Sequence, residues 1–192
     1  MTDVSRGSPS PVLFVPRPST WLVWHAHVFR PGARVLDIAS GEGRHALAVA
    51  QMGGEVTAID KDEAKLEAGK ESARRLGVSV RWICADLEGP WPELGVFDVV
   101  MIFNYLDRAR MPDIIKLIAP GGFLFMETFL EGQVAYGWGP TNSAHLLRPG
   151  ELRGLVAPLE VVHGREVVEP LEAGRERVVG SVVAQRVAVV QE

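Results

Sequence analysis

Apolar and polar positions alternate in blocks along the first two thirds of the chain. Five short apolar runs predict buried strands. They fall at residues 35–38, 56–59, 78–84, 97–103 and 123–129. Three segments between them favour helix, at residues 44–51, 62–76 and 108–118. Because strands and helices alternate, we expect a parallel sheet with helices on both faces.

The last third of the chain departs from this alternation. Residues 131–148 show no period, and a connection of that length usually has a function. Residues 149–155 predict one or two helical turns, and residues 159–168 and 178–190 predict the two strands of a closing hairpin. The pattern therefore predicts an α/β fold with a Rossmann-like, doubly wound, seven-stranded sheet. It is mostly parallel, with one antiparallel strand from the C-terminal hairpin.

The N-terminal segment has a different composition. Residues 1–18 are rich in serine, proline and arginine without a period, which predicts an extended or disordered arm. Residues 19–192 are expected to form a single domain. A first helix is expected over residues 20–29, capped by Ser19 or Thr20. Its residues Trp21, Trp24 and His25 share one helical face, which either packs on the sheet or covers a ligand.

Residues 34–60 form the most informative unit, which reads as strand, glycine loop, helix and strand. The loop Ser40-Gly41-Glu42-Gly43 follows the first strand, and the helix begins directly after it. Such a loop lets a ligand approach the backbone at a helix N-terminus. Asp60 ends the second strand, where a carboxylate can accept hydrogen bonds from ribose hydroxyls. These features predict a nucleoside-binding site.

Two nucleoside cofactors fit this unit, and charge separates them. Residues 41–46 match the dinucleotide fingerprint G-x-G-x-x-A, which leaves an NAD(P)-dependent oxidoreductase as an alternative. However, Asp37 and Glu42 place carboxylates beside the loop, where they would repel a pyrophosphate. They would attract the ammonium and sulfonium of S-adenosylmethionine, by up to about 4 kcal/mol for charges ~4 Å apart. We therefore expect S-adenosylmethionine as the cofactor.

Composition and charge narrow the class of partner. The chain has 192 residues and a formal net charge of −4, which argues against a nucleic-acid surface. Its single cysteine, Cys84, is typical of a reducing compartment. No uncharged run reaches the ~20 residues of a membrane span. We expect a cytoplasmic protein with a small-molecule partner, without a nucleic-acid or membrane partner. Monomer and homodimer both stay open.

Five segments, in order, resemble the motifs of class I S-adenosylmethionine-dependent methyltransferases. The first is D-I-A-S-G-E-G, which carries Ala39 at the family's first glycine. The acid after the second strand is Asp60, and Ala85-Asp86-Leu87 follows the third strand. The fourth motif is F-D-V-V-M-I-F-N, and residues 118–122 introduce the fifth strand. The runs SGEGRHA, FNYLDR, FLFMETF and LLRPGEL resemble the small bacterial tellurite-resistance-like methyltransferases within this class.

The resemblance implies a set of cofactor contacts. Asp37 would face the methionine ammonium, and the loop would let the backbone approach the methionine moiety and the sugar. Asp60 would bind the ribose, and Asp86 the adenine amino group. Lys61 either flanks the adenine or is solvated. The implied cofactor-binding residues are Asp37, Ala39, Gly41, Gly43, Asp60, Lys61, Ala85, Asp86, Leu87 and Asn104.

The acceptor side is expected after the fourth and fifth strands. Candidate substrate contacts are Tyr105, Glu127, Tyr136, His145 and Arg148. His145 or Glu127 would serve as a general base if the acceptor arrives protonated, and the sequence assigns no catalytic residue. No histidine or cysteine cluster has metal-ligand spacing, so we expect no metal. The expected function is methyl transfer to a small molecule, and a cofactor-binding protein without turnover is a further alternative.

Overall fold

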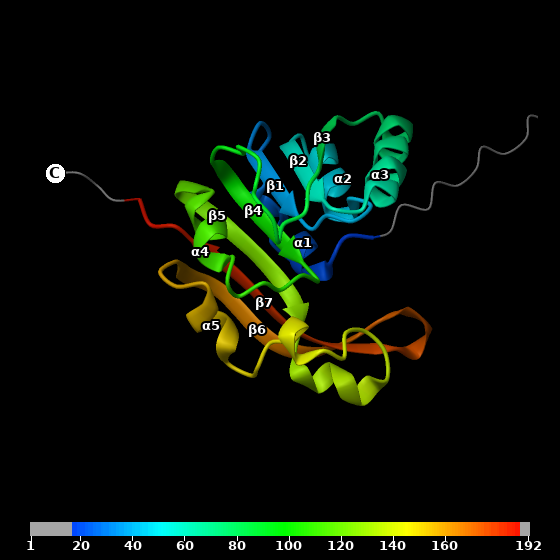
Figure 1. Cartoon of the computed structure of the whole chain (residues 1–192), viewed down its shortest axis with the longest axis vertical. Helices are drawn as coiled ribbons and strands as arrows, with labels where there is room; N and C mark the ends of the chain where they lie inside the picture. Colours follow the sequence, from blue (N-terminus) through cyan, green and yellow to red (C-terminus); the bar gives the residue numbers. More distant parts are fainter. Residues whose placement is uncertain (1–16, 189–192) are drawn as a thin grey trace, which may run out of the picture.

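A seven-stranded sheet forms the centre of the computed structural model, which describes residues 17–188 (Figure 1). Its order is β3-β2-β1-β4-β5-β7-β6. Neighbouring strands from β3 to β5 are parallel, whereas β7 is antiparallel to both β5 and β6. This confirms the predicted sheet. The strands are β1 (Arg34–Ile38), β2 (Glu55–Asp60), β3 (Val80–Cys84), β4 (Phe97–Phe103), β5 (Ile118–Phe129), β6 (Glu160–Pro170) and β7 (Glu176–Gln185).

Short helices cover both faces of the sheet (Figure 1). The α-helices are α1 (Thr20–Trp24), α2 (Arg44–Gln51), α3 (Glu63–Leu76), α4 (Met111–Lys116) and α5 (Glu151–Leu155). The 3₁₀ turns are η1 (Ala26–Val28), η2 (Glu131–Tyr136), η3 (Ser143–His145) and η4 (Glu172–Gly174). α1 and α2 pack on one face, while α4 and α5 pack on the other. The three layers bury β1 and β4 on both sides, which explains their continuous apolar runs.

The helix boundaries follow local sequence signals. Ser19 Oγ accepts a hydrogen bond from Trp21 N–H and caps α1, and Asp62 caps α3 in the same way through Lys65 N–H. α3 ends at Gly77, whose φ of +68° lies in the left-handed region that glycine favours. These caps confirm the predicted starts of both helices.

Several boundaries differ from the prediction. α4 spans Met111–Lys116 and is shorter than the predicted 108–118, and β7 ends at Gln185 and not at residue 190. The helix expected over residues 20–29 breaks at His25 into α1 and η1. β5 begins at Ile118, because Phe97 pairs with Ile118 before the register of β4 and β5 shifts. The irregular connection 131–148 contains η2 and η3. In each case tertiary pairing or packing decided what the local sequence left open.

Two further predictions concern the N-terminal arm and membrane-spanning segments. Most of the arm expected over residues 1–18 lies outside the described residues. Within 17–188, no helix combines the length and the apolar character needed to cross a membrane.

Candidate functional site

The C-terminal ends of β1 to β4 surround a groove where the strand order reverses. The chain runs outward from β1 to β3 and then crosses to β4 on the other side of β1. Ligands of open α/β sheets bind at such a switch point. Two cavities of ≈370 Å³ and ≈210 Å³ adjoin there, and Ala39, Asp60 and Lys65 line both. We call this continuous site the strand-end groove.

Most predicted cofactor residues meet in this groove. The larger cavity is lined by Asp37, Ala39, Gly41, Asp60 and Asn104 among them. The smaller cavity is lined by Ala39, Asp60, Lys61, Asp86 and Leu87, together with Tyr105 from the acceptor set. Neither Gly43 nor Ala85 lines the groove. The sequence motifs therefore meet in the strand-end groove, although Gly43 and Ala85 do not line it.

Asp60 holds the glycine loop from the end of β2. Its Oδ2 accepts a hydrogen bond from Gly41 N–H at 2.7 Å, and its Oδ1 accepts one from Asp62 N–H at 2.9 Å. In this loop Ala39 adopts a φ of +54°, where a side chain with a Cβ is strained. This positive φ explains why the motif of class I methyltransferases has a glycine at this position. Asp60 shapes the loop in addition to the ligand-binding role predicted for it.

Asp37 is a buried carboxylate of the larger cavity. It is 1% exposed, and its Oδ2 accepts a hydrogen bond from Ala46 N–H at 3.1 Å. Burial raises the pKa of Asp37 to about 7, although this hydrogen bond and the charge of Arg44 act in the opposite direction. A cationic ligand would favour the ionised carboxylate. This position suits the ammonium-binding role predicted for Asp37.

Several further residues line the groove outside the predicted cofactor set, and of these only Glu42 entered the charge argument from the sequence. The larger cavity is also lined by Ser40, Glu42, Arg44, His45, Lys65 and Phe103. Ser40 Oγ is the one buried side-chain polar atom within residues 17–188 that lacks a hydrogen-bond partner. A buried hydroxyl without a partner is uncommon, so it is available to a polar ligand. Their positions in the sequence could have identified Ser40 and Lys65 as site residues. Ser40 lies in the loop after β1, and Lys65 lies in the first turn of α3, which follows β2.

His45 combines a structural position with contact to the cavity. It is 3% exposed and stacks on Phe103 with 3.7 Å between ring centroids. Its Nε2 accepts a hydrogen bond from Ser19 N–H at 3.2 Å, which ties the start of α1 to α2. Burial lowers the pKa of His45 well below its ordinary value, so this ring is neutral near pH 7.

Gly43 has a packing role, and the backbone approach to the ligand stays a prediction. It precedes α2 with a φ of +75°, and a Cβ on it would lie 2.4 Å from the Trp82 ring. Gly69 of α3 meets the same ring, and its Cβ would lie 2.5 Å away. Two glycines thus make room for one indole between α2, α3 and β3.

The smaller cavity follows the ends of β2 and β3. Lys61 Nζ lies 3.8 Å from Glu88 Oε1, and both side chains are exposed. Asp86 Oδ1 accepts a hydrogen bond from Glu88 N–H at 3.0 Å, so Asp86 shapes a turn while lining the cavity. Tyr105 is half-buried, and burial with nearby Asp107 raises its pKa to about 12. Its phenol therefore stays protonated and can donate a hydrogen bond at neutral pH.

Ala85 and Asn104 connect the groove to the strands. Ala85 N–H donates to Asp60 O at 3.0 Å, which fixes the chain after β3 against β2. Asn104 leaves β4 with a φ of +56°, a conformation that asparagine tolerates better than most residues. Its N–H donates to Glu127 O at 2.8 Å. Asn104 is thus both a turn residue and part of the cavity wall.

Glu127 occupies a buried ion-pair network, which corrects its expected contact with the acceptor. It is 0% exposed. Its Oε1 accepts from Ser19 Oγ at 2.6 Å and lies 2.9 Å from Arg177 Nη2. Its Oε2 accepts from Ser181 Oγ at 2.8 Å and lies 3.3 Å from Arg165 Nη2. With both oxygens bound, Glu127 joins α1 to the β6–β7 hairpin and has no free oxygen for a general base.

The other acceptor candidates lie outside the groove. Tyr136 of η2 is 37% exposed, and His145 and Arg148 are exposed as well. None of the three lines the strand-end groove. Their connection is tied to β7 through Gln133, whose Oε1 accepts a hydrogen bond from Val178 N–H at 2.8 Å. The long connection therefore follows the hairpin and not the ends of β1 and β2.

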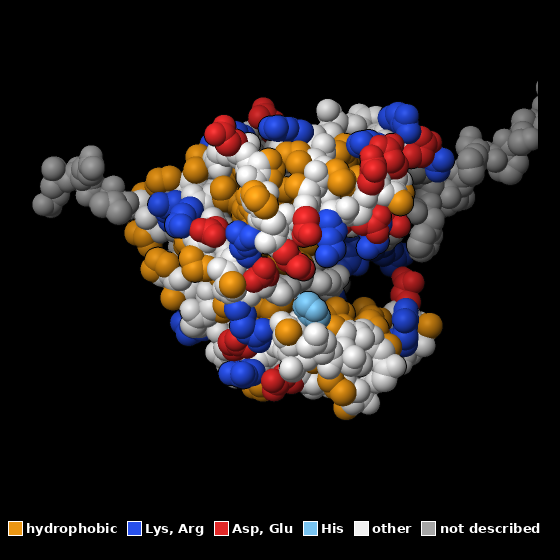
Figure 2. Space-filling model, viewed as in Figure 1, with side chains coloured by type: hydrophobic (Ala, Val, Ile, Leu, Met, Phe, Trp, Pro, Cys, Tyr) orange, Lys and Arg blue, Asp and Glu red, His pale blue; other side chains and the backbone are white. Residues whose placement is uncertain are grey.

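A further hollow adjoins the groove at Arg44. It has a volume of ≈620 Å³ and lies between residues 17–20, the start of α2 and the tip of the β6–β7 hairpin. We call it the arginine pocket, because Arg17, Arg44, Arg175 and Arg177 line it. Figure 2 shows the surface hollowed near the hairpin tip, with lysine and arginine side chains along the hollow. Arg44 lines both cavities, so the two sites share a wall at this residue.

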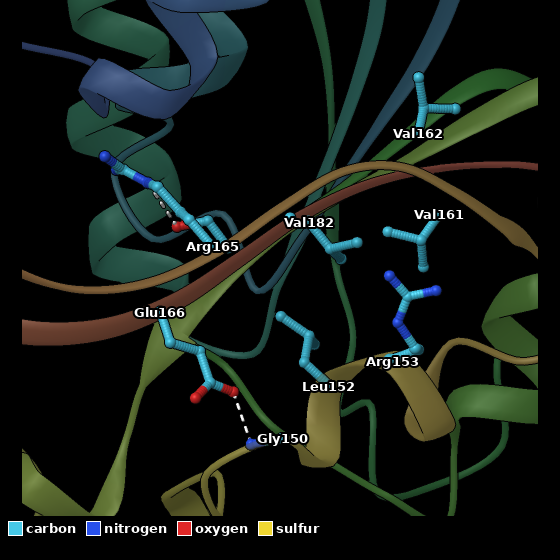
Figure 3. Close-up of a pocket in the computed structure, with 10 residues that line it drawn as sticks. Gly150, Leu152, Arg153, Val161, Val162, Arg165, Glu166 and Val182 are labelled. Carbon is cyan, nitrogen blue, oxygen red and sulfur yellow. Dashed lines mark hydrogen bonds between the residues drawn. The ribbon is translucent and has the colours of Figure 1, made fainter.

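A separate hollow of ≈350 Å³ lies between α5 and β6 and shares no lining residue with the groove. Figure 3 shows Leu152, Val161 and Val182 turned toward one another there, while Arg165 points to the other side of the strands. Glu166 accepts a hydrogen bond from Gly150 N–H at 2.7 Å on its rim. This hollow is a depression beside the edge strand, and it contains none of the predicted site residues.

The charges of the groove fit S-adenosylmethionine better than a dinucleotide. No group of three or more potential metal ligands occurs within residues 17–188. Asp37 supplies an anion beside the loop, Ser40 an unused hydroxyl, and Asp60 a carboxylate between the two cavities. The methionine end of S-adenosylmethionine, with its ammonium, matches Asp37 and Ser40, and its nucleoside end matches Asp60.

Comparison with known proteins defines the class. Residues 35–122 match the family model described as "Methyltransferase domain". A protein-L-isoaspartate O-methyltransferase of Methylorubrum populi is 36% identical over 104 residues, which are 54% of this chain and 48% of that protein. The chain spans about half the length of this curated relative. Other relatives are a ribosomal RNA methyltransferase and a ubiquinone biosynthesis O-methyltransferase, so the acceptors of the relatives differ.

Solved structures share the fold. TehB from Haemophilus influenzae superposes with a TM-score of 0.69 at 19% identity, covering 86% of this chain and 61% of that one. A SAM-dependent methyltransferase from Methanosarcina mazei gives 0.70 at 19% identity, covering 86% and 97%. Residues 35–122 therefore carry the match to a methyltransferase domain, and the fold resembles that of S-adenosylmethionine-dependent methyltransferases, the TehB-like proteins among them.

Proposed function

We propose that this protein transfers a methyl group from S-adenosylmethionine to a small-molecule acceptor that binds in the arginine pocket. The observation that carries the proposal is the junction at Arg44, where the arginine pocket meets the larger cavity of the strand-end groove. The pocket's ≈620 Å³ lies within the usual range for small-molecule sites. The net charge of −4 also favours a small acceptor over a nucleic acid.

The proposed roles follow from the positions of the side chains. Asp37 holds the ammonium, Ser40 donates to or accepts from the methionine end, and Asp60 binds the ribose while it fixes the loop. Asp86 and Leu87 line the adenine end. When bound, S-adenosylmethionine supplies a methyl carbon whose bond to sulfur breaks, with both electrons, as the acceptor's lone pair forms the new bond. Because this displacement depends mainly on alignment, the protein's main contribution is to hold the two ligands close together.

Binding calorimetry tests the cofactor site. S-adenosylhomocysteine should bind to the full chain, whereas NAD should not. Asp60→Ala should weaken binding by about tenfold to a hundredfold, because it removes charge-assisted hydrogen bonds. It also removes the acceptor for Gly41 N–H, so the stability of the variant is measured alongside. NAD binding without S-adenosylhomocysteine binding would overturn the proposal.

A matched control is available at the opposite end of the sheet. Asp98 Oδ2 accepts a hydrogen bond from Arg34 N–H at 2.8 Å, so Asp98→Ala also removes an acceptor from a backbone group. This variant should bind S-adenosylhomocysteine like the parent protein. Equal losses in both variants would indicate a general stability effect and would remove Asp60 from the site.

Turnover separates an enzyme from a protein that only binds the cofactor. Transfer of labelled methyl from S-adenosylmethionine is measured across small thiols, amines, carboxylates and chalcogen oxyanions. Methylated product with one class supports the proposal. Tight cofactor binding without product from any class would favour the non-catalytic alternative.

A further inference from the structure

The arginine pocket carries more positive than negative charge. Its lining contains four arginines, and its acidic lining residues are Glu169 and Glu172. Most of these charges are already used within the protein. Arg177 pairs with Glu127 at 2.9 Å and also with Glu169, and Arg17 lies 3.5 Å from Glu172.

Arg175 and Arg44 differ from these two. The guanidinium of Arg175 lies over the Trp138 ring, 5.1 Å from its centroid. Arg44 is half-buried at the first position of α2, and its side chain makes no hydrogen bond or ion pair with any residue of 17–188. The charges of Arg177, Glu127 and Asp37 act on the pKa of Arg44, and none of these side chains forms an ion pair with it. Arg44 is therefore the unused cation of the pocket.

An unpaired, half-buried guanidinium is costly. Burial and the neighbouring Arg177 lower the pKa of Arg44 from its ordinary value, so both disfavour its charge in the free protein. An anionic ligand would offset this cost, because a guanidinium binds carboxylates and phosphates through two parallel hydrogen bonds. The position of Arg44 is the second part of the argument, since it lines the cofactor cavity as well.

The size and the remaining walls indicate an organic ligand. A bare inorganic oxyanion would fill a small part of ≈620 Å³. Pro18, Pro170 and Leu171 supply apolar wall next to the arginines. Apolar walls with a few placed polar groups are typical of sites for organic molecules.

We propose that the arginine pocket binds the methyl acceptor as an organic anion, either a carboxylate or a phosphate monoester, whose charged group pairs with Arg44. Its carbon skeleton packs against Pro18, Pro170 and Leu171. The inference rests on the proposed function and deepens it, because it names the chemical class of the acceptor.

A series of matched aromatic probes tests the charge requirement. Benzoate, phenyl phosphate, neutral benzamide and inorganic sulfate are titrated into the full chain by calorimetry, with and without saturating S-adenosylhomocysteine. Benzoate or phenyl phosphate should bind at least about tenfold more tightly than benzamide, because a charge-assisted hydrogen bond exceeds a neutral one by about that factor. The ranking of the two anions identifies carboxylate or phosphate as the preferred group. Sulfate should bind more weakly than both.

Variants locate the effect at Arg44. Arg44→Gln should abolish the preference for benzoate over benzamide, and Arg44→Lys should retain part of it. Arg30→Gln removes one exposed positive charge near the other end of the strands and should leave the preference unchanged. Thermal unfolding of each variant shows that it is folded.

Each contrary outcome is distinct. Equal binding of benzoate and benzamide, no binding of either anion, or a preference that survives Arg44→Gln would overturn the anion site. Sulfate binding as tightly as benzoate would overturn the organic ligand. Absence of S-adenosylhomocysteine binding counts against the proposed function alone, because the titrations without it still test the arginine pocket.

Discussion

The ionisation of Asp37 links cofactor affinity to pH. Its pKa of about 7 in the free protein lies well above the ordinary 3.8 of the side chain. At about 1.4 kcal/mol per pKa unit, burial of the charged form costs about 4 kcal/mol near neutral pH and above. Asp37→Asn removes this cost and keeps an oxygen that can accept the Ala46 N–H.

The sign of the stability change follows from proton binding. Between pH 3.8 and about 7 the folded free protein holds a proton on Asp37 that the unfolded chain has lost. The free energy of unfolding therefore falls as pH rises through this window and levels off above about pH 7. Asp37→Asn should lack this fall, and near pH 8 it should be more stable than the parent by up to about 4 kcal/mol.

Ligand binding should show the opposite trend. The ammonium of S-adenosylhomocysteine favours the ionised carboxylate, so affinity should rise by roughly tenfold per pH unit up to about pH 7 and then become constant. Asp37→Asn should bind more weakly at high pH, with little dependence on pH. His45 lines the same cavity, but its lowered pKa keeps it neutral over most of this range.

Calorimetry between about pH 5 and about pH 9 measures both the affinity and the proton released. Titrations in two buffers of different ionisation heat count that proton directly. Parent and Asp37→Asn proteins with the same pH slope would refute the assignment. A parent protein without proton release near pH 6 would refute it as well.

Three further substitutions test the packing around the site. Ala39→Gly removes the Cβ from a backbone with a φ of +54°, and it should raise the free energy of unfolding by up to about 1 kcal/mol in urea denaturation. A lower free energy of unfolding in this variant would refute the backbone strain at Ala39. Gly69→Ala places a Cβ 2.5 Å from Trp82 and should cost about 1–3 kcal/mol, although alanine favours helix. Trp82→Leu should rescue it, and a stabilised Gly69→Ala would show that the contact is absent. Glu127→Ala removes one of the two carboxylates that pair with Arg165 and Arg177, while Glu169 still pairs with both. It should cost about 1–3 kcal/mol, with S-adenosylhomocysteine affinity of the folded protein unchanged; a specific loss of affinity would place Glu127 in the site.

The sequence determined the sheet and most residues that line the strand-end groove, because their signals are local. Apolar runs of strand length, the caps at Ser19 and Asp62, and the stop at Gly77 each act within a few residues. Strand-end residues such as Asp37 and Asp60 meet automatically, since parallel strands end at the same edge of the sheet.

Only the tertiary structure decided the role of Glu127 and the place of Arg44. Glu127 looks like a strand-end base in the sequence, yet the hairpin brings Arg165 and Arg177 onto it from residues far along the chain. The same hairpin forms one wall of the arginine pocket and turns Arg44, a helix-start residue, into the junction of two cavities. Which charges are paired and which remain free depends on the antiparallel register of β5, β7 and β6, and no local pattern encodes that register.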